Sequence, residues 1–156
     1  MQLTEATKKG EQILKQISPF IARGRLAGSI RRKRPIVKDI DIVVELKPTH
    51  LDNIKKSLAD LGELKLKGDK LIRLITKDNV QVDVYIGTKE NYEPLLLIRT
   101  GSKEHNVKLT TRAHIFNYKL TANGLINTKT GYIIATSEKD IFKALKMSYV
   151  DPQNRN

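Results

Sequence analysis

The chain has 156 residues, of which 39% are hydrophobic and 29% are charged, a composition typical of one soluble domain or of two small lobes that share a core. It contains no cysteine, which excludes disulfides, thiolate nucleophiles and cysteine-bound zinc, and no apolar run is long enough to cross a membrane. Lysine and arginine exceed aspartate and glutamate by 29 to 17, so the net charge is +12 and we expect a nucleic-acid partner. Charged residues near the N-terminus (Lys8, Lys9 and Glu11) are unlike a signal peptide, so we expect an intracellular protein.

Apolar spacing in the first half predicts a strand-rich region with helices. A helix is expected from Thr4 to Pro19, a short strand at Arg25–Ala27, and a second helix from a Thr49 cap to Leu61. The remaining predicted strands are Asp39–Leu46, Leu64–Leu66, Leu71–Thr76 and Val80–Ile86, and we expect the last three to form a meander.

Two aspartates open the strand Asp39–Leu46, after a Gly28-Ser29 turn and the pair Arg31-Arg32. Side chains alternate along a strand, so Asp39 and Asp41 point to one side and repel each other unless a cation sits between them. Oxygen ligands favour Mg²⁺, and the Gly-Ser turn with nearby guanidinium charge is typical of a phosphate cradle. The alternative is that both aspartates are merely solvated at a strand start.

A third acid, Asp83, shares one strand face with Gln81 and Tyr85. If its strand lies beside Asp39–Leu46, the three carboxylates can hold two divalent ions ~3.5–4 Å apart.

The second half is more basic. We expect a helix at Asn91–Ile98, a break at Arg99–Ser102, a helix from Lys103 to Tyr118, a hairpin of Gly124–Ile126 with Tyr132–Ile134, and a helix at Glu138–Lys146 capped by Ser137. The cations of the central helix either contact phosphates or form a solvated face; they are Lys103, Lys108, Arg112 and Lys119. The three histidines are too widely spaced for a zinc site.

The order of these motifs resembles the family X DNA polymerases, those like DNA polymerase beta. The stretch Gly28-Ser29-x-Arg31-Arg32 followed by Asp39-x-Asp41 resembles their active-site signature, and Val82-Asp83-Val84 resembles their third carboxylate strand. The run from Arg99 to Asn106 resembles their thumb motif, and the segments 137–142 and 149–155 resemble their C-terminal end. The resemblance implies an α+β fold: a nucleotidyltransferase palm with a mixed β-sheet and helices at residues 1–87, then a small α+β thumb at residues 88–156.

By this resemblance, the reaction is template-directed addition of a dNMP from a dNTP to a primer 3′-hydroxyl, in short-gap DNA repair. Asp39, Asp41 and Asp83 are the implied catalytic residues and ligands of two Mg²⁺ ions, for which Mn²⁺ can substitute. The implied nucleotide-binding residues are Gly28, Ser29, Arg32, Lys38, Gly101, Ser102, Lys103 and Asn106. The implied DNA-binding residues are Arg99, His105, Lys108, Arg112 and Lys119. Arg31 is an expected ion-pair partner of Glu138, and we expect a monomer.

Four departures bear on activity. The chain begins at the palm, so we expect no lyase domain and no helix-hairpin-helix clamps. Ile98-Arg99 replaces aromatic residues near the sugar, Thr110 stands where relatives often place an arginine, and residues 121–123 replace a more acidic, aromatic run. The alternatives are a template-independent nucleotidyltransferase that extends DNA ends or modifies RNA or protein, and a basic DNA-binding module without catalysis.

Overall fold

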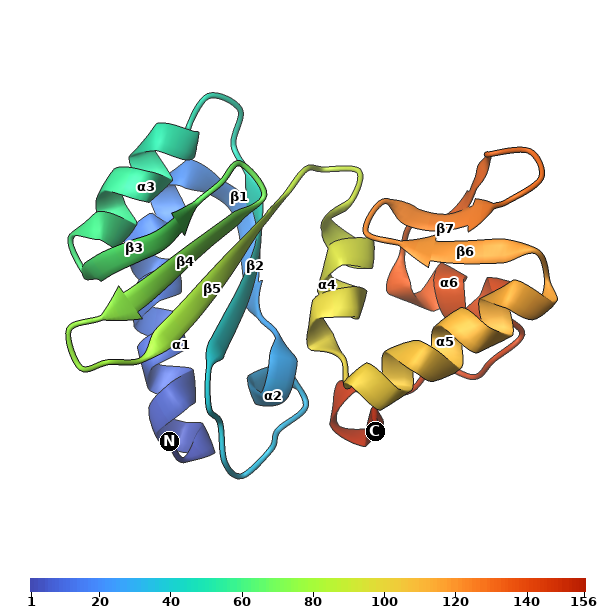
Figure 1. Cartoon of the computed structure of the whole chain (residues 1–156), viewed down its shortest axis with the longest axis horizontal. Helices are drawn as coiled ribbons and strands as arrows, with labels where there is room; N and C mark the ends of the chain where they lie inside the picture. The colour runs from blue at the N-terminus through green and yellow to red at the C-terminus, as the bar shows by residue number, and fades with distance from the viewer.

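The computed structural model describes residues 1–156 and consists of two lobes side by side, with helix α4 (Tyr92–Thr100) between them (Figure 1). The first lobe contains a five-stranded sheet, and the second lobe contains a three-stranded sheet. The predicted α+β class is confirmed. The predicted palm–thumb boundary falls in the connection between the first sheet and α4.

The first lobe alternates helices with strands that pair in the order β1-β2-β5-β4-β3. The central strands β2 and β5 are parallel, all other neighbours are antiparallel, and β3, β4 and β5 form the predicted meander. The elements are α1 (Leu3–Ile17), η1 (Ser18–Phe20), β1 (Ile21–Leu26), α2 (Gly28–Arg31), β2 (Ile40–Leu46), α3 (Leu51–Ala59), β3 (Gly62–Lys67), β4 (Leu71–Thr76) and β5 (Gln81–Gly87).

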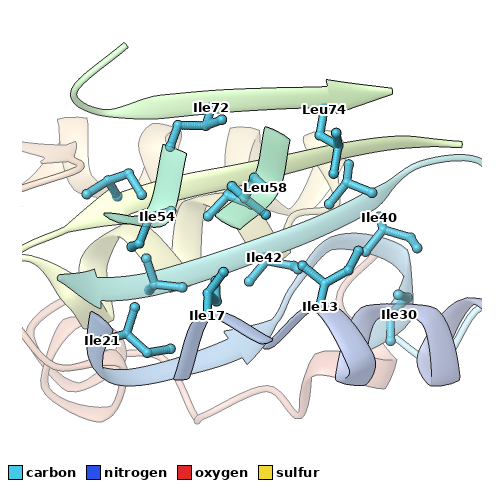
Figure 2. Close-up of a cluster of buried hydrophobic side chains, with 14 of the residues drawn as sticks. Ile13, Ile17, Ile21, Ile30, Ile40, Ile42, Ile54, Leu58, Ile72 and Leu74 are labelled. Carbon is cyan, nitrogen blue, oxygen red and sulfur yellow. The ribbon is translucent and has the colours of Figure 1, made fainter. Parts of the chain in front are cut away.

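Helices α1 and α3 cover one face of this sheet because alternate strand residues are apolar. Figure 2 shows the resulting core, in which Ile40 and Ile42 of β2 pack with Ile17 of α1 and Leu58 of α3. The intervening strand residues therefore face the other side. There α4 packs on Val43, towards the carboxyl end of β2.

The second lobe packs helices against a sheet of order β6-β7-β8. Its further elements are α5 (Lys103–Ile115), β6 (Tyr118–Thr121), β7 (Gly124–Asn127), β8 (Ile133–Ala135), α6 (Glu138–Ala144) and η2 (Pro152–Asn154). The hairpin of β7 and β8 is as predicted. The prediction that the helix runs to Tyr118 is wrong: it ends at Ile115, since Asn117 adopts a φ of 58°, and Tyr118 begins a strand that was not predicted.

Several boundaries in the first lobe also differ from prediction: β3 spans Gly62–Lys67 rather than Leu64–Leu66, and β2 begins at Ile40 rather than at Asp39. Thr49 does not cap α3, because its φ is 68° and the helix begins after His50 without a side-chain cap. Strand β1 begins at Ile21 rather than at Arg25 because it pairs with β2 from Ile21 to Leu26, with an irregularity between Ile21 and Arg23. None of the helices has the length and apolar character needed to span a membrane.

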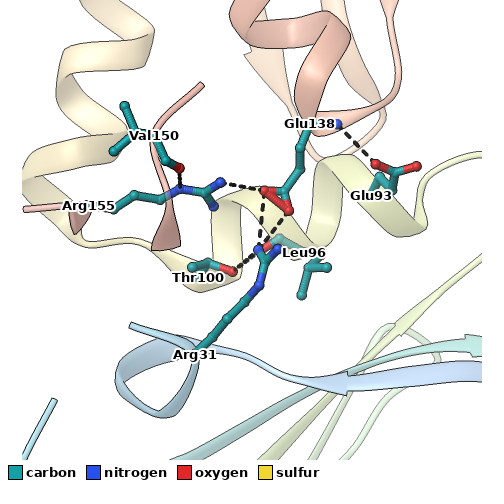
Figure 3. Close-up of polar contacts among 7 residues, drawn as sticks. All are labelled: Arg31, Glu93, Leu96, Thr100, Glu138, Val150 and Arg155. Carbon is teal, nitrogen blue, oxygen red and sulfur yellow. Dashed lines mark hydrogen bonds and ion pairs between the residues drawn. The ribbon is translucent and has the colours of Figure 1, made fainter. Parts of the chain in front are cut away.

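An ion-pair cluster joins the two lobes (Figure 3). Arg31 Nη1 of α2 lies 2.7 Å from Glu138 Oε1 of α6 and donates a hydrogen bond to Thr100 Oγ1 at 2.9 Å. On the other side of the same carboxylate, Arg155 Nη2 lies 2.8 Å from Glu138 Oε2. The predicted pair of Arg31 and Glu138 is thus confirmed, and the C-terminal segment takes part in it.

Candidate functional site

Two acidic side chains lie next to each other on the sheet face opposite the core. Asp41 of β2 is in register with Asp83 of β5, and side chains in register on parallel strands point to the same face. Asp83 is buried, with 4% of its surface exposed, and Asp41 is partly buried. Asp39 lies immediately before β2, in the loop that leads from α2.

The carboxylates of this acidic group act on one another. Burial, followed by the negative charges of Asp83 and Asp39, raises the pKa of Asp41 to about 6, although Arg99 and Arg32 oppose the shift. Asp41 is therefore a partly buried oxygen donor beside two other carboxylates. Carboxylate oxygens are the ligands that suit a hard divalent cation such as Mg²⁺.

Arg73 of β4 forms an ion pair with Asp83, the third acidic residue of the site. Its Nε donates to Asp83 Oδ1 at 2.8 Å and its Nη2 donates to Asp83 Oδ2 at 3.0 Å, a two-pronged pair. The sequence reasoning did not single out this arginine. In this arrangement no three acidic or histidine side chains converge as a metal cage, and Arg73 engages both oxygens of Asp83.

Gly28 is pressed against Asp41. Its φ is 54°, and a Cβ added there would lie 2.2 Å from Asp41 Oδ2. The neighbouring Ala27 donates its backbone N–H to the carbonyl of Asp41 at 2.8 Å. A residue without a side chain is therefore required where the chain turns from β1 into α2, and this turn brings Ser29 close to the carboxylates.

The predicted phosphate-binding side chains differ in their exposure to solvent and in their hydrogen bonds within the protein. Ser29 is partly exposed in the first turn of α2, and Lys38 is exposed. Arg32 Nη1 donates to the carbonyl of Thr100 at 2.5 Å, whereas its Nε is buried and has no hydrogen-bond partner. Arg32 thus lies between Asp41, whose charge acts on it, and the carbonyl of Thr100. Its Nε donor is not used in the protein.

The turn before α5 is built by Gly101 and Ser102. Gly101 has a φ of 68°, and a Cβ there would lie 3.1 Å from Arg32 Nη1. Ser102 Oγ accepts from the backbone N–H of His105 and so caps α5. Asn106 Nδ2 donates to the carbonyl of Ile98, and its Oδ1 is buried without a partner. Lys103 is exposed beside this turn.

His105 does not lie where a DNA contact was predicted. Its side chain is only 4% exposed and packs beside Phe142 with ring centroids 5.9 Å apart. Burial, aided by the charges of Arg155 and Lys108, lowers the pKa of His105 to about 4. We therefore correct the prediction: His105 belongs to the core of the second lobe, because it shares one helical stripe with Leu109 and Ala113.

The other predicted DNA-binding residues are placed unequally. Lys108 and Lys119 are exposed. Arg112 Nε donates to the carbonyl of Leu145, so this arginine fastens α5 to the end of α6. The guanidinium of Arg99 stacks over the ring of Tyr85, 4.3 Å from its centroid.

A cavity of about 830 Å³ lies between the lobes at the carboxyl ends of β2 and β5. Tyr85 and Arg99 form part of its wall, and Asn91 and Asn123 bridge it with a hydrogen bond of 3.2 Å. The hydroxyl of Tyr85 donates to Asp83 Oδ2 at 3.5 Å, so this cavity adjoins the acidic group.

Comparison with known proteins extends the likeness over the whole chain. Residues 95–156 match the family model described as DNA polymerase beta thumb. The DNA polymerase/3′-5′ exonuclease PolX of Bacillus subtilis is 28% identical over 151 residues, which cover 93% of this chain and 26% of that protein. The DNA nucleotidylexotransferase of Xenopus laevis is 37% identical over 79 residues, 49% of this chain and 16% of that protein. The chain thus spans about a quarter or less of the length of these relatives.

Solved structures of Leishmania infantum polymerase beta share the fold. Its ternary P/T complex superposes with a TM-score of 0.87 at 18% identity, over 100% of this chain and 76% of that one. Its ternary gap complex superposes with a TM-score of 0.88 at 17% identity, over 100% of this chain and 70% of that one. The fold likeness therefore includes both lobes.

Proposed function

We propose that this family X DNA polymerase-like chain transfers a dNMP from a dNTP to a primer 3′-hydroxyl in short-gap DNA repair. The observation that carries this proposal is the register of Asp41 with Asp83, beside a glycine turn that leaves no room for a side chain. In this proposal, the acidic oxygens would bind metal next to the donors of the turn, which would bind phosphate, as nucleotidyl transfer requires.

Asp39, Asp41 and Asp83 are the residues that would hold two Mg²⁺ ions. Their fit rests on the chemistry of the donor set: Asp41 and Asp83 are in register on neighbouring strands, and the charges of Asp83 and Asp39 both act on Asp41. When bound, the ions would lower the pKa of the attacking hydroxyl and neutralise charge on the triphosphate. The aspartates themselves would orient the reacting groups, and Asp83 would accept the proton of the 3′-hydroxyl.

The triphosphate would lie against the turn between β1 and α2. Backbone N–H groups near Gly28 and Lys38 and the hydroxyl of Ser29 are donors for phosphate oxygens. Arg32 has a buried Nε without a partner, and phosphate would complete its hydrogen bonding. Because Arg32 also holds the carbonyl of Thr100, phosphate binding would act on the turn of the second lobe.

The sugar and base would approach the turn Gly101-Ser102. A glycine there lets the backbone come close to the sugar, and Lys103 and Asn106 would line the base and its minor-groove edge. Asn106 keeps an unpartnered Oδ1 for this purpose.

DNA would be gripped mainly by charge. The net charge of +12 and the exposed cations of the second lobe favour phosphate contacts, and Lys103, Lys108 and Lys119 are the residues that we assign to them. Arg99 would join them only by leaving its stack on Tyr85, and Arg112 would do so only by rotating away from Leu145.

Incorporation on a gapped duplex tests the proposal. The full chain is mixed with a labelled primer at a one-nucleotide gap, one dNTP, and Mg²⁺ or Mn²⁺. We expect templated extension by one nucleotide, and loss of it by at least ~100-fold in Asp41→Asn, since removing one charged ligand disrupts a site that acts as a unit. Asp60→Asn, the same change at an exposed position at the end of α3, is the matched control.

Activity that survives in Asp41→Asn would contradict the assignment of the aspartates. Metal-independent DNA binding with no extension in any variant would instead support a binding module without catalysis.

A second candidate is template-independent addition to DNA ends. It is favoured by the likeness to the frog DNA nucleotidylexotransferase over 79 residues. Equal extension of single-stranded and gapped primers, without regard to the template base, would select this function over gap filling.

A further inference from the structure

Arg73 lies beside the buried carboxylate of Asp83 and acts as its counter-ion. It lies on β4, in register with Asp83 on the neighbouring β5, so both side chains project from the same sheet face. Its two hydrogen bonds of 2.8 and 3.0 Å engage both oxygens of Asp83, whose other contacts, from Gln81 and Tyr85, are both 3.5 Å long. The guanidinium is therefore the principal partner of that buried carboxylate.

This pair competes with a metal ion for the third ligand. A forked guanidinium takes up one lone pair on each oxygen of Asp83 and neutralises its charge, so the carboxylate is a weaker ligand for a divalent ion while the pair is closed. Metal binding at all three aspartates is therefore favoured when Arg73 releases Asp83. Arg73 also lies near enough to Asp39 for their charges to interact, so it counterbalances the acidic group as a whole.

The side chain of Arg73 is partly exposed to solvent, so it has room to move away from Asp83. Its neighbours Ile72 and Leu74 point into the core and are fully buried, whereas the side chain of Arg73 keeps 35% of its surface exposed on the opposite face. Leu66, its partner in register on β3, is exposed, so the face around Arg73 is accessible from solvent. A guanidinium pairs with phosphate in the same forked geometry as with carboxylate.

We propose that Arg73 is an exchangeable counter-ion and positioning residue: it pairs with Asp83 in the free protein and moves to a phosphate of the bound primer strand, which frees Asp83 for the divalent ion. DNA and metal then bind cooperatively, because each favours the state in which the pair of Arg73 and Asp83 is open. This inference rests on the proposed function, since it takes the primer to lie on this sheet face.

Binding of Mn²⁺ to the full chain, measured by electron paramagnetic resonance of free Mn²⁺, tests the inference without turnover. Affinity is measured alone and with a gapped duplex whose primer ends in a dideoxynucleotide. In the natural chain, DNA is expected to tighten Mn²⁺ binding about tenfold, within the usual range of coupling between sites. In Arg73→Leu, Mn²⁺ is expected to bind tightly without DNA, and the increase with DNA to fall to about twofold or less.

Three variants make the outcome decisive. Arg25→Leu removes an equal charge from an exposed position on β1 and should keep the tenfold coupling. Arg73→Lys keeps the charge and loses the fork, so its coupling should be intermediate. If Arg73→Leu does not fold, Arg73→Lys and Arg73→Gln carry the test.

The failure of this inference is distinguishable from failure of the proposed function. Mn²⁺ binding that depends on Asp41, with coupling to DNA unchanged in the Arg73 variants, overturns the role of Arg73 and leaves the proposed function standing. No Mn²⁺ binding that depends on Asp41, with or without DNA, overturns both.

Discussion

Glu138 in α6 forms ion pairs with two arginines that are far apart in the sequence. Its Oε1 lies 2.7 Å from Arg31 Nη1, and its Oε2 lies 2.8 Å from Arg155 Nη2. The Arg155 side chain is fully buried and also lies 5.4 Å from the ring centroids of Phe142 and Tyr149. One carboxylate thus fastens the turn beside the acidic site to the C-terminal segment.

Glu138→Gln should therefore be strongly destabilising. Removing one partner of a buried ion pair leaves the other charges uncompensated, and we expect a loss of about 3–5 kcal/mol in the free energy of unfolding. Glu45→Gln breaks the more exposed pair with Arg23 and should cost no more than about 1 kcal/mol. Urea unfolding of both variants checks this, and equal losses would show that the cluster does not hold the lobes together.

Gly28→Ala should damage the site more than the fold. The new methyl group would overlap Asp41 Oδ2, so the carboxylate has to move, and we expect incorporation to fall by at least ~10-fold because catalysis is sensitive to small misplacements. The matched control is Gly131→Ala, which shares a positive φ of 74° but meets no atom within 4 Å.

Backbone strain alone should cost both glycine variants about 1 kcal/mol of stability. Thermal unfolding measures that common cost. If Gly131→Ala lost as much activity as Gly28→Ala, strain rather than contact with Asp41 would explain the loss.

His105 should make the protein sensitive to mild acid. Burial lowers its pKa to about 4, while in the unfolded chain the ring titrates near its ordinary value of 6.5. As pH falls from 6.5 towards 4, protons bind the unfolded state first, so stability present above pH 6.5 is lost. At pH 5 the loss is about 2 kcal/mol relative to pH 7.5.

His105→Leu should remove that loss, and it also removes two ring nitrogens that have no partner in the core. The test is the difference in unfolding free energy between pH 7.5 and pH 5, compared with that of the natural chain. The control, His114→Leu, changes an exposed histidine on the same helix and should keep the acid sensitivity of the natural chain.

DNA affinity should depend steeply on salt. The logarithm of the binding constant should fall by roughly 0.9 for each phosphate contact per tenfold increase in salt, and Lys108→Gln or Lys119→Gln should each reduce the slope by about 1. Lys56→Gln lies on α3, which covers the other face of the first sheet, and should leave the slope unchanged. A flat salt response of the natural chain would contradict the assigned phosphate contacts.

The strands and the pairing of Asp41 with Asp83 were predictable because alternation marks the faces of a strand, and the family resemblance set β2 beside β5. Arg73 was missed although a signal exists. The turn signal at Asp78-Asn79 indicates that β4 and β5 pair, but the register depends on the length of the loop. A two-residue turn would place residue 73 opposite residue 84, whereas the observed pairing is centred on residue 78 and sets Arg73 opposite Asp83.

Three other features were not predicted: two had a signal in the sequence that was misinterpreted, and one depends on contacts between distant segments. The spacing of His105 with Leu109 and Ala113 marks a buried stripe, but the basic character of the helix suggested a DNA contact. Asn117 is a typical residue at a helix end, and it could have signalled the end of α5. The burial of Arg155 depends on contacts across distant segments, which no local pattern predicts.

The central claim is that these aspartates direct attack of a primer hydroxyl on the α-phosphate of a dNTP. The most direct measurement follows two labels on one gapped substrate with Mg²⁺ or Mn²⁺: a dNTP labelled at the α-phosphate and the same dNTP labelled at the γ-phosphate. Our account predicts that the α label enters the primer and the γ label leaves as pyrophosphate, both in the natural chain and in Asp60→Asn and neither in Asp41→Asn. Release of the γ label as inorganic phosphate, or transfer that persists in Asp41→Asn, would contradict it.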